Sequence, residues 1–409
     1  MVDVAKAMKV AGLFAGIGGM ELGLAKAGHA TELLVEIDPG ANAVLRARFP
    51  GIEQAADVRA LKSLPSGIDL LAAGFPCQDL SQAGHTGGIH ASRSGLVGEV
   101  FRLARKSRVP WILLENVPFM LQLNRGEAIR HIADELEAMG YAWAYRKIDT
   151  RAFGLPQRRE RVFLLASLVA DPAAILFQRQ VVPATPVDHR NVACGFYWTE
   201  GTRGLGWAVD AVPTLKGGST IGIPSPPAIW MPDGLICTPD LRDGERLQGF
   251  QADWTKPAEI AGRASHRWKL IGNAVSVPAA EWAGSVLNRK PGGLPSFTSP
   301  LATKGSWPAA AYGNKGVRRE VPSSTWPVAR KAKPLADFLR YPVKALSERA
   351  TAGFYKRLTG GSLRFPAEFR AALEKHLLAD REESPHARHV GTVPVAKALD
   401  QIPFLRPRA

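Results

Sequence analysis

The sequence predicts a doubly wound α/β fold with a mostly parallel sheet, a smaller loop-rich region and a basic C-terminal extension. Over residues 1–167, apolar runs alternate with helical patterns, as strands and covering helices do in a parallel sheet. Residues 168–240 hold nine prolines and eight glycines with few helical periods, which indicates a loop-rich insert. We expect residues 241–290 to return to the first domain and residues 291–409, with 20 basic and 9 acidic side chains, to form the extension.

The expected strands are short apolar runs, namely residues 10–14, 32–36, 69–73, 111–115, 142–148 and 161–166. The clearest helix covers residues 126–139, because apolar side chains recur there at three- and four-residue spacing and Gly140 ends the pattern. A doubly wound sheet binds its ligands beyond the carboxyl ends of its strands. The residues that follow each strand are therefore the candidates for chemistry.

The charge balance favours a polyanionic partner. The 409 residues include 52 Lys and Arg against 37 Asp and Glu, a formal net charge of +15. The sequence has no run of about 18 apolar residues and no apolar signal region near Met1, so we expect neither a membrane span nor secretion. The cysteines Cys77, Cys194 and Cys237 stand too far apart for a metal-binding pair, which indicates a reducing compartment such as the cytoplasm and no metal site.

A glycine-rich turn follows the first expected strand. Phe14 precedes Gly16, Gly18 and Gly19, which let a ligand approach the backbone at the N-terminus of the next helix. The dinucleotide fingerprint has a glycine where Glu21 stands here, and this weakens a nicotinamide interpretation.

Two carboxylates follow the turn at informative positions. Glu36 ends the second strand 20 residues after Gly16, where an acidic side chain accepts hydrogen bonds from ribose hydroxyls. Asp57 precedes a short helical stretch and is placed to do the same for an adenine amino group. Taken singly, each carboxylate fits equally well as a solvent-facing loop charge.

A cysteine and a glutamate follow the next two strands. A lone cysteine is usually a small buried apolar residue, but Cys77 opens a segment rich in Gly, Ser and His, which favours a reactive thiol. Glu115 closes the apolar strand at residues 111–115. Partial burial there would raise the pKa of its carboxyl and suit it to donate a proton.

These residues resemble the motifs of the cytosine-C5 DNA methyltransferases, and the resemblance runs from about residue 9 to residue 280. Six motifs stand in the family's order, namely residues 14–19 (FAGIGG), 76–78 (PCQ), 115–117 (ENV), 157–161 (QRRER), 242–250 (RDGERLQGF) and 272–275 (GNAV). Unrelated sequences almost never contain all six, so the signal is highly specific.

The resemblance implies the S-adenosylmethionine-dependent methyltransferase fold and a DNA (cytosine-5-)-methyltransferase that acts on a cytosine flipped out of the duplex. The Cys77 thiolate would add to C6 of the base, and Glu115 would protonate N3 to offset the resulting charge. Arg159 and Arg161 would complete the catalytic set, with Arg161 near the base O2.

The resemblance also implies a cofactor, S-adenosyl-L-methionine. The residues it assigns to that cofactor are Phe14, Gly16, Gly18 and Gly19 at the methionine end, Glu36 at the ribose, Ile37 and Asp57 at the adenine, Asn273 from the far end of the chain, and Pro76. One departure is Gly12, where the family often has an acidic residue. Cys194 and Cys237 match no motif and are expected to take no part.

The insert at residues 168–240 stands where the family has its target recognition domain. Pro- and Gly-rich loops can reach base edges in the major groove, but no residue code converts them into a target sequence. Thr214-Leu215 resembles a dipeptide common in such domains. The basic extension fits two interpretations equally, a solvated surface or a set of contacts to the DNA backbone.

Several alternatives remain at this point. A transfer-RNA cytosine methyltransferase shares the catalytic core but usually carries a Cys-Phe-Thr motif that this sequence lacks. A non-catalytic DNA-binding homologue would not need Cys77 and Glu115, and a nicotinamide oxidoreductase would leave both unexplained. We expect a monomeric bacterial or phage enzyme acting on double-stranded DNA, with a restriction endonuclease as a candidate partner.

Overall fold

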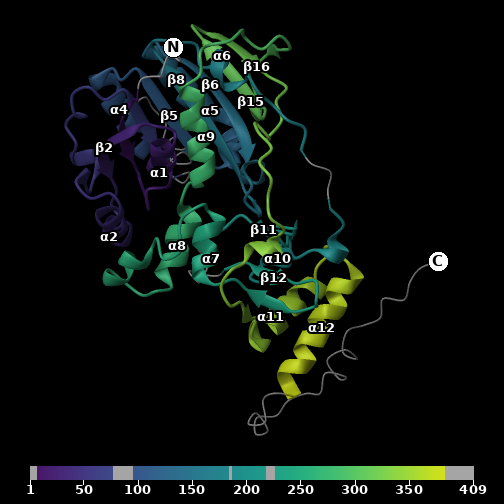
Figure 1. Ribbon diagram of the computed structural model, residues 1–409. Coiled ribbons are helices and arrows are strands. Elements are labelled where there is room, and N and C mark those ends of the chain that lie inside the picture. The colour runs from purple at the N-terminus through teal and green to yellow at the C-terminus, as the bar shows by residue number, and fades with distance from the viewer. Residues whose placement is uncertain (1–6, 77–94, 184–186, 218–225, 383–409) are drawn as a thin grey trace.

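The computed structural model describes residues 7–76, 95–183, 187–217 and 226–382. Two sheets organise these residues (Figure 1). The ten-stranded sheet with its helices is called the large part below, and the five-stranded sheet with the helices that cover it is called the small part.

The ten strands of the large part are β1 (Lys9–Leu13), β2 (Ala30–Val35), β3 (Glu53–Ala55), β4 (Leu70–Ala73), β5 (Trp111–Asn116), β6 (Ala142–Asp149), β8 (Glu160–Ser167), β14 (Ser299–Pro300), β15 (Ala310–Asn314) and β16 (Val317–Glu320). Their order is β14-β16-β15-β6-β8-β5-β4-β1-β2-β3. Strands β1 to β5 are parallel, whereas β8 runs antiparallel to both of its neighbours, β5 and β6. All six strands expected from the sequence are confirmed, in a mostly parallel sheet.

Helices cover both faces of this sheet, as the nearly continuous apolar strands require. The helices are α1 (Gly19–Lys26), α2 (Pro39–Arg48), α4 (Leu96–Ser107), α5 (Glu127–Ala138), α6 (Ala173–Leu176) and α9 (Val277–Leu287). One face packs against α4 and α5 and the other against α1, α6 and α9, because alternate residues of each strand point to opposite faces. Helix α9 follows the last motifs in the sequence, so residues 277–287 return to the large part (Figure 1).

The small part contains β9 (Cys194–Phe196), β10 (Ala208–Val209), β12 (Ala228–Trp230), β13 (Ile236–Thr238) and β17 (Lys344–Ala345), in the order β10-β9-β12-β13-β17. Between the two parts, β7 (Gln157–Arg158) pairs in parallel with β11 (Val212–Pro213). Two further helices lie in this region, α7 (Leu241–Leu247) and α8 (His266–Asn273).

Much of the expected basic extension is built into both parts. Strand β15 pairs with β6 and widens the large sheet, and β17 adds an edge to the small sheet. The helices α10 (Leu335–Phe338), α11 (Glu348–Thr359) and α12 (Ala367–Glu382) lie beside the small sheet (Figure 1). Phe354 and Phe369 are fully buried against Phe196, with ring centroids 5.0 and 4.9 Å from it. The described portion of the extension is therefore not a solvated tail, because its apolar side chains complete the core of the small part.

A buried carboxylate lies under the glycine-rich turn. Glu21, in the first turn of α1, is 1% exposed, and its Oε2 atom has no hydrogen-bond partner among the described residues. A Cβ atom at Gly12 would stand 2.2 Å from Glu21 Oε1, so the carboxylate occupies the space that a side chain at position 12 would need. Burial raises the pKa of Glu21 to about 7, and the nearby charge of Glu36 adds to the shift.

We predict that Glu21→Gln stabilises the protein in a pH-dependent way. Folding raises the pKa of Glu21 from 4.5 to about 7, so the folded chain binds this proton more tightly and stability falls as pH rises through that interval. Glutamine does not ionise. The variant should exceed the wild type by roughly 2–4 kcal/mol above pH 7 and by much less at pH 5.

Urea unfolding followed by circular dichroism at pH 5 and pH 8 measures the difference. The matched control is Glu53→Gln, which removes an exposed carboxylate from β3. A gain for Glu21→Gln that is the same at both pH values would contradict this account of the buried carboxylate.

Candidate active site

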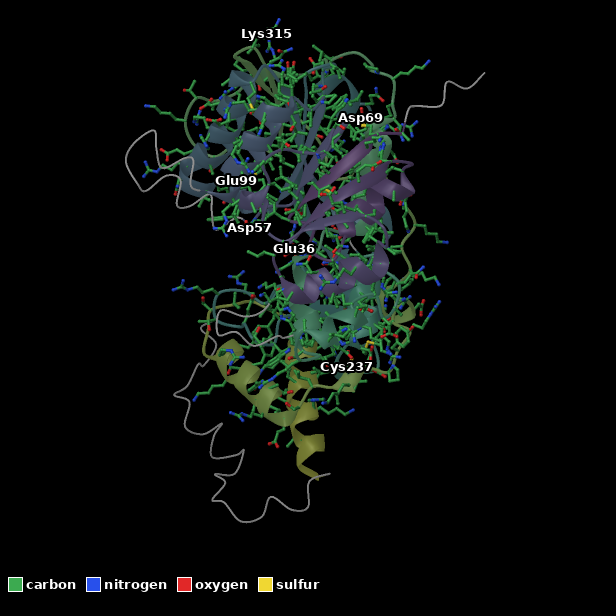
Figure 2. All side chains as sticks on the ribbon, turned by 90° about the vertical axis from the view of Figure 1, so that its left-hand side faces the viewer. Glu36, Asp57, Asp69, Glu99, Cys237 and Lys315 are labelled. Carbon is green, nitrogen blue, oxygen red and sulfur yellow. The ribbon has the colours of Figure 1, made fainter. Side chains whose placement is uncertain are left out.

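A cavity of about 910 Å³ opens at the carboxyl ends of β1, β2, β4 and β5. The predicted residues that line it are Phe14, Gly16, Glu36, Ile37, Asp57, Pro76, Glu115, Arg161 and Asn273. Figure 2 shows Glu36, Asp57 and Glu99 close together where the large part faces the small part. Cys77 directly follows Pro76 in the sequence and lies outside the described residues.

The glycine-rich turn is held by the carboxylate of Glu36. The Gly16 N–H donates to Glu36 Oε2 at 2.8 Å, and the Asp38 N–H donates to Glu36 Oε1 at 2.7 Å. These two bonds fix the carboxylate at the end of β2, facing the cavity. Gly16 has a φ of 55°, in the left-handed region that favours glycine.

Gly18 and Gly19 do not line the cavity, although we expected them at the methionine end. A Cβ atom at Gly18 would lie 2.2 Å from the Phe49 ring, and one at Gly19 would lie 2.3 Å from the Val275 carbonyl oxygen. Both glycines are therefore needed because helix α1 starts against α2 and against the chain that enters α9.

Ile37 and Asp57 form the neighbouring wall. Ile37 is 65% exposed although it is apolar, which leaves a hydrophobic surface open in the cavity. Asp57 caps a short 3₁₀ helix by accepting the Arg59 N–H at 2.9 Å. The Arg59 guanidinium holds the pKa of Asp57 below its usual range, so this carboxylate is ionised at neutral pH.

The reversed strand β8 brings Arg161 beside Glu115. Glu115 pairs with Phe163 across the antiparallel ladder of β5 and β8, which places the start of β8 at the carboxyl end of β5. Arg161 Nε lies 3.0 Å from Glu115 Oε1, and both side chains are nearly buried. Burial raises the pKa of Glu115, while the cations of Arg161 and Arg159 oppose the rise. The cavity thus holds a carboxyl group whose proton is retained to a higher pH than that of an exposed glutamate.

Arg159 does not face the cavity, although we expected it among the catalytic residues. Its guanidinium is 1% exposed and donates to three backbone carbonyls, those of Leu215 at 3.0 Å, Gly272 at 3.2 Å and Ala274 at 2.7 Å. A buried guanidinium needs several acceptors, and the chain around Asn273 supplies them. Arg159 therefore holds the loop that carries Asn273.

Two residues at the site, Asn116 and Lys269, were not selected from the sequence alone. Asn116 donates from Nδ2 to the Phe75 carbonyl at 2.9 Å and so ties the end of β4 to the end of β5. Lys269 lines the cavity one helical turn before Asn273, and its Nζ lies 4.0 Å from Asp38 Oδ2. The spacing of Lys269 and Asn273 on α8 was the signal available in the sequence.

The dipeptide Thr214-Leu215 lies where the small part meets this site. Thr214 Oγ1 donates to the Arg158 carbonyl at 2.9 Å, and the Leu215 N–H donates to Gln157 Oε1 at 3.1 Å. The chain that follows β11 is thereby tied to residues 157 and 158.

Comparisons with known proteins agree with this geometry. Residues 8–187 match the family model described as C-5 cytosine-specific DNA methylase. The Type II methyltransferase M2.BsuMI of Bacillus subtilis (strain 168) is 48% identical over 383 residues, which cover 90% of this chain and 98% of that protein. The chain belongs to the C-5 cytosine-specific DNA methylases.

Two further proteins are similar over most of their own length. The Type II methyltransferase M.NgoBI of Neisseria gonorrhoeae is 29% identical over 67% of this chain and 90% of that protein. The solved structure of the Entamoeba histolytica methyltransferase EhMeth superposes with a TM-score of 0.50 at 16% identity, covering 69% of this chain and 98% of that one. At that identity the structural likeness supports the fold alone.

The methylase transfers the methyl group of S-adenosyl-L-methionine to C5 of cytosine in DNA, by way of the covalent cysteine adduct that is standard for its family. The cavity fits this cofactor. Each Glu36 oxygen accepts one backbone N–H and keeps a further lone pair, which suits the carboxylate to accept ribose hydroxyls. The exposed Ile37 side chain offers an apolar surface for a purine ring.

The two described cysteines take no part in the site. Cys194 and Cys237 are buried in the small part, and burial raises their pKa to about 11 and about 12. Both thiols are therefore protonated at neutral pH. Within the described ranges, no helix is both long and apolar enough to span a membrane.

We predict that Arg161→Gln raises the pKa of Glu115 further. The substitution removes the cation that favours the ionised carboxylate, while the burial that disfavours it remains. A carbon-13 titration of labelled glutamate carboxyls, with the signal assigned by Glu115→Gln, measures this pKa. Lys147→Gln is the matched control, because Lys147 pairs with Glu160 on the neighbouring strand at 3.1 Å. An unchanged pKa in Arg161→Gln would show that the ion pair does not act on Glu115.

Proposed function

We propose that this methylase modifies one specific DNA site and that Cys77 is its nucleophile, Glu115 its proton donor and Arg161 the cation that orients Glu115. The observation that carries this proposal is the buried pair of Glu115 and Arg161 on the wall of a cavity that Pro76 also lines. Cys77 is the next residue after Pro76 in the sequence, which supports its assignment to this site.

In the proposed reaction, Cys77 forms the covalent bond to the base and Glu115 transfers the proton. The Cys77 thiolate forms a bond to C6 of the flipped cytosine, and the C5–C6 double-bond electrons move toward C5 as Glu115 donates its proton to N3. When bound, S-adenosyl-L-methionine would supply an electrophilic methyl group to C5, with its sulfur–methyl bond broken and S-adenosyl-L-homocysteine as the leaving group. Loss of the C5 proton to a base then restores the double bond, the thiolate leaves, and Glu115 recovers its proton from N3.

The cofactor is assigned to the residues that line the cavity. Phe14, Gly16 and Pro76 surround the methionine end, Glu36 accepts the ribose hydroxyls, and Ile37 packs on the adenine with Asp57 at its amino group. Asn273 closes the pocket from α8. Gly18 and Gly19 support this pocket through the packing of α1.

The two parts divide the work. We assign catalysis and cofactor binding to residues 1–167 and 241–290, and target recognition to residues 168–240 together with the helices α10–α12 that complete the small part. Side chains of the small part would read base edges, and basic side chains of residues 291–409 would contact phosphates. Double-stranded DNA is the substrate of this arrangement.

The cellular setting follows from the substrate. We propose a monomer in the cytoplasm of a bacterial cell or of a phage-infected host, where the DNA lies. Its relatives carry the name Type II methyltransferase, which supports a cognate restriction endonuclease as partner. Bisulfite sequencing of host DNA with and without the gene would show the modified site.

We predict that Cys77→Ala abolishes methyl transfer while the protein still binds DNA and cofactor, because only the nucleophile is lost. The wild type should form a denaturant-resistant adduct on DNA that contains 5-fluorocytosine, and the variant should form none. Cys194→Ala is the control, since that thiol is buried in the small part. Full activity in Cys77→Ala would refute the proposed mechanism.

We predict that Glu36→Ala weakens the binding of S-adenosyl-L-methionine by about 1–3 kcal/mol, because ribose hydroxyls lose their acceptor. Isothermal titration calorimetry measures the change, and Glu53→Ala removes a carboxylate from the neighbouring β3 as the control. If both variants bind the cofactor like the wild type, the assignment of Glu36 fails.

A further inference from the structure

The segment of residues 212–217, called the bridging segment below, contacts residues 157–159 on one side and the loop of Asn273 on the other. Arg159 donates to the Leu215 carbonyl as well as to the carbonyls on either side of Asn273. A Cβ atom at Gly272 would lie 2.2 Å from the Lys216 carbonyl oxygen, and one at Gly217 would lie 2.3 Å from Asn273 Oδ1. Backbone therefore packs directly on backbone, and a shift of the bridging segment would displace the loop that carries Asn273.

A second element holds the bridging segment from the side of the small part. This supporting turn, residues 197–201, contacts the bridging segment at Thr214 and at Lys216. The Tyr197 hydroxyl donates to the Thr214 carbonyl, and the Lys216 ammonium lies 4.1 Å from the centre of the Tyr197 ring. The same ammonium pairs with the Glu200 carboxylate.

Helix α11 in turn holds the supporting turn. Arg357 donates from Nε to the Glu200 carbonyl at 2.9 Å and from Nη2 to the Trp198 carbonyl at 2.7 Å. Gly201 has a φ of 122°, and a Cβ atom there would lie 3.3 Å from Arg357 Cβ. The supporting turn therefore packs directly against α11, and the two hydrogen bonds from Arg357 fix its distance from the helix.

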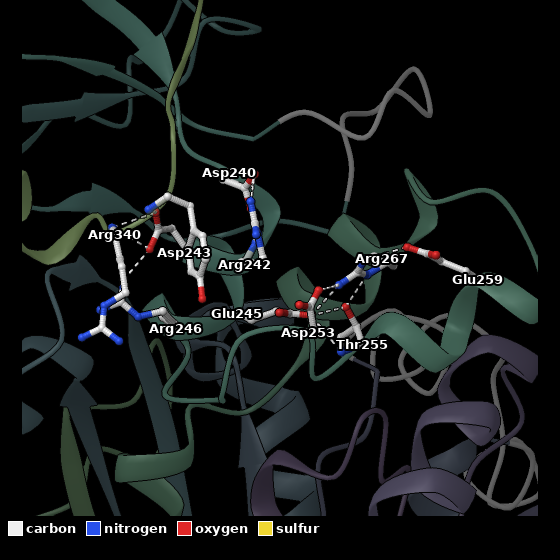
Figure 3. A network of polar contacts seen from close by, with 11 residues as sticks. Asp240, Arg242, Asp243, Glu245, Arg246, Asp253, Thr255, Glu259, Arg267 and Arg340 are labelled. Atoms are coloured by element: carbon white, nitrogen blue, oxygen red, sulfur yellow. Dashed lines mark hydrogen bonds and ion pairs between the residues drawn. The ribbon is translucent and has the colours of Figure 1, made fainter.

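The position of α11 is set by contacts that reach back to the catalytic motifs. On the helix itself, Phe354 and Leu358 are buried in the core of the small part. On the chain that leads to it, the buried Asp243 of α7 accepts the Arg340 N–H at 3.1 Å and the Tyr341 N–H at 2.9 Å (Figure 3). The segment of residues 340–358 is therefore held at its start by α7 and at its end by the core of the small part.

We infer that Arg357 is a positioning residue for methyl transfer, acting through the supporting turn on Lys216 and the loop of Asn273. Arg357 lies on a helix far along the sequence from every motif, and its guanidinium donates to two backbone carbonyls of the turn. This inference rests on the proposed function, since it depends on the assignment of Asn273 to the cofactor pocket. Misplacement of a supporting element by a fraction of an ångström to 1 Å is enough to slow a reaction strongly.

Single-turnover methylation of a DNA fragment that contains the bisulfite-mapped site provides the test. Arg357→Ala should slow the chemical step by about 10-fold or more at saturating S-adenosyl-L-methionine, while the melting temperature stays close to that of the wild type. Lys356→Ala is the matched control, because it removes the same charge from an exposed neighbouring position on α11. Millimolar guanidinium should restore part of the rate to Arg357→Ala and none to the control.

A second variant tests the same link without altering α11. Glu200→Gln leaves the backbone carbonyl in place but removes the partner of Lys216, and it should slow the step in the same direction. If Arg357 acts through the supporting turn, the double variant should be no slower than the slower single variant. Multiplied effects of the two substitutions, or a rate for Arg357→Ala equal to that of Lys356→Ala, would overturn the inference. Should Arg357→Ala fail to fold, unchanged chemistry in Glu200→Gln would overturn it equally.

The outcome also separates this inference from the proposed function. A wild type that does not methylate the mapped DNA refutes the proposed function itself. An active wild type with an unaffected Arg357→Ala refutes only the positioning role.

Discussion

The antiparallel placement of β8 between β5 and β6 is the constraint on which the active site depends. In an all-parallel sheet the N-terminal end of the next strand would lie at the edge opposite the cavity. Because β8 is reversed, its first residues lie at the carboxyl end of β5, and Arg161 meets Glu115 at 3.0 Å. The Glu115 carboxyl group is therefore buried beside a cation. Burial raises its pKa, so that it can hold a proton, and the Arg161 cation balances its charge when it is ionised.

The second organising feature is the contact of backbone with backbone between the two parts. Gly217 and Gly272 have no side chains, and this lets the bridging segment lie against the loop of Asn273. Arg159 then satisfies carbonyls on both sides of the contact. The loop of Asn273, which lines the cavity, is thus held in place from the side of the bridging segment.

Residues after the last motif complete this arrangement. Helices α11 and α12 supply Phe354 and Phe369, which bury Phe196, and β17 adds an edge strand to the small sheet. Asp243 ties the incoming chain to α7 by accepting two backbone N–H groups, as Figure 3 shows for Arg340. A carboxylate that is fully buried needs several donors, so the pairing also commits residues 340 and 341 to one place.

The sequence alone was enough for the family, the six core strands and most of the residues on the cavity wall, because these depend on local patterns. Strand periodicity, a glycine turn and short motifs at strand ends are written in neighbouring residues. The roles of Gly18, Gly19 and Arg159 were decided by the tertiary structure, since each depends on groups distant in the sequence, such as Phe49, Val275 and Leu215. The same is true of residues 291–382. Their basic charge was visible in the sequence. The apolar side chains of α11 and α12 could be recognised as core only from the fold, because they are buried by packing against the small sheet.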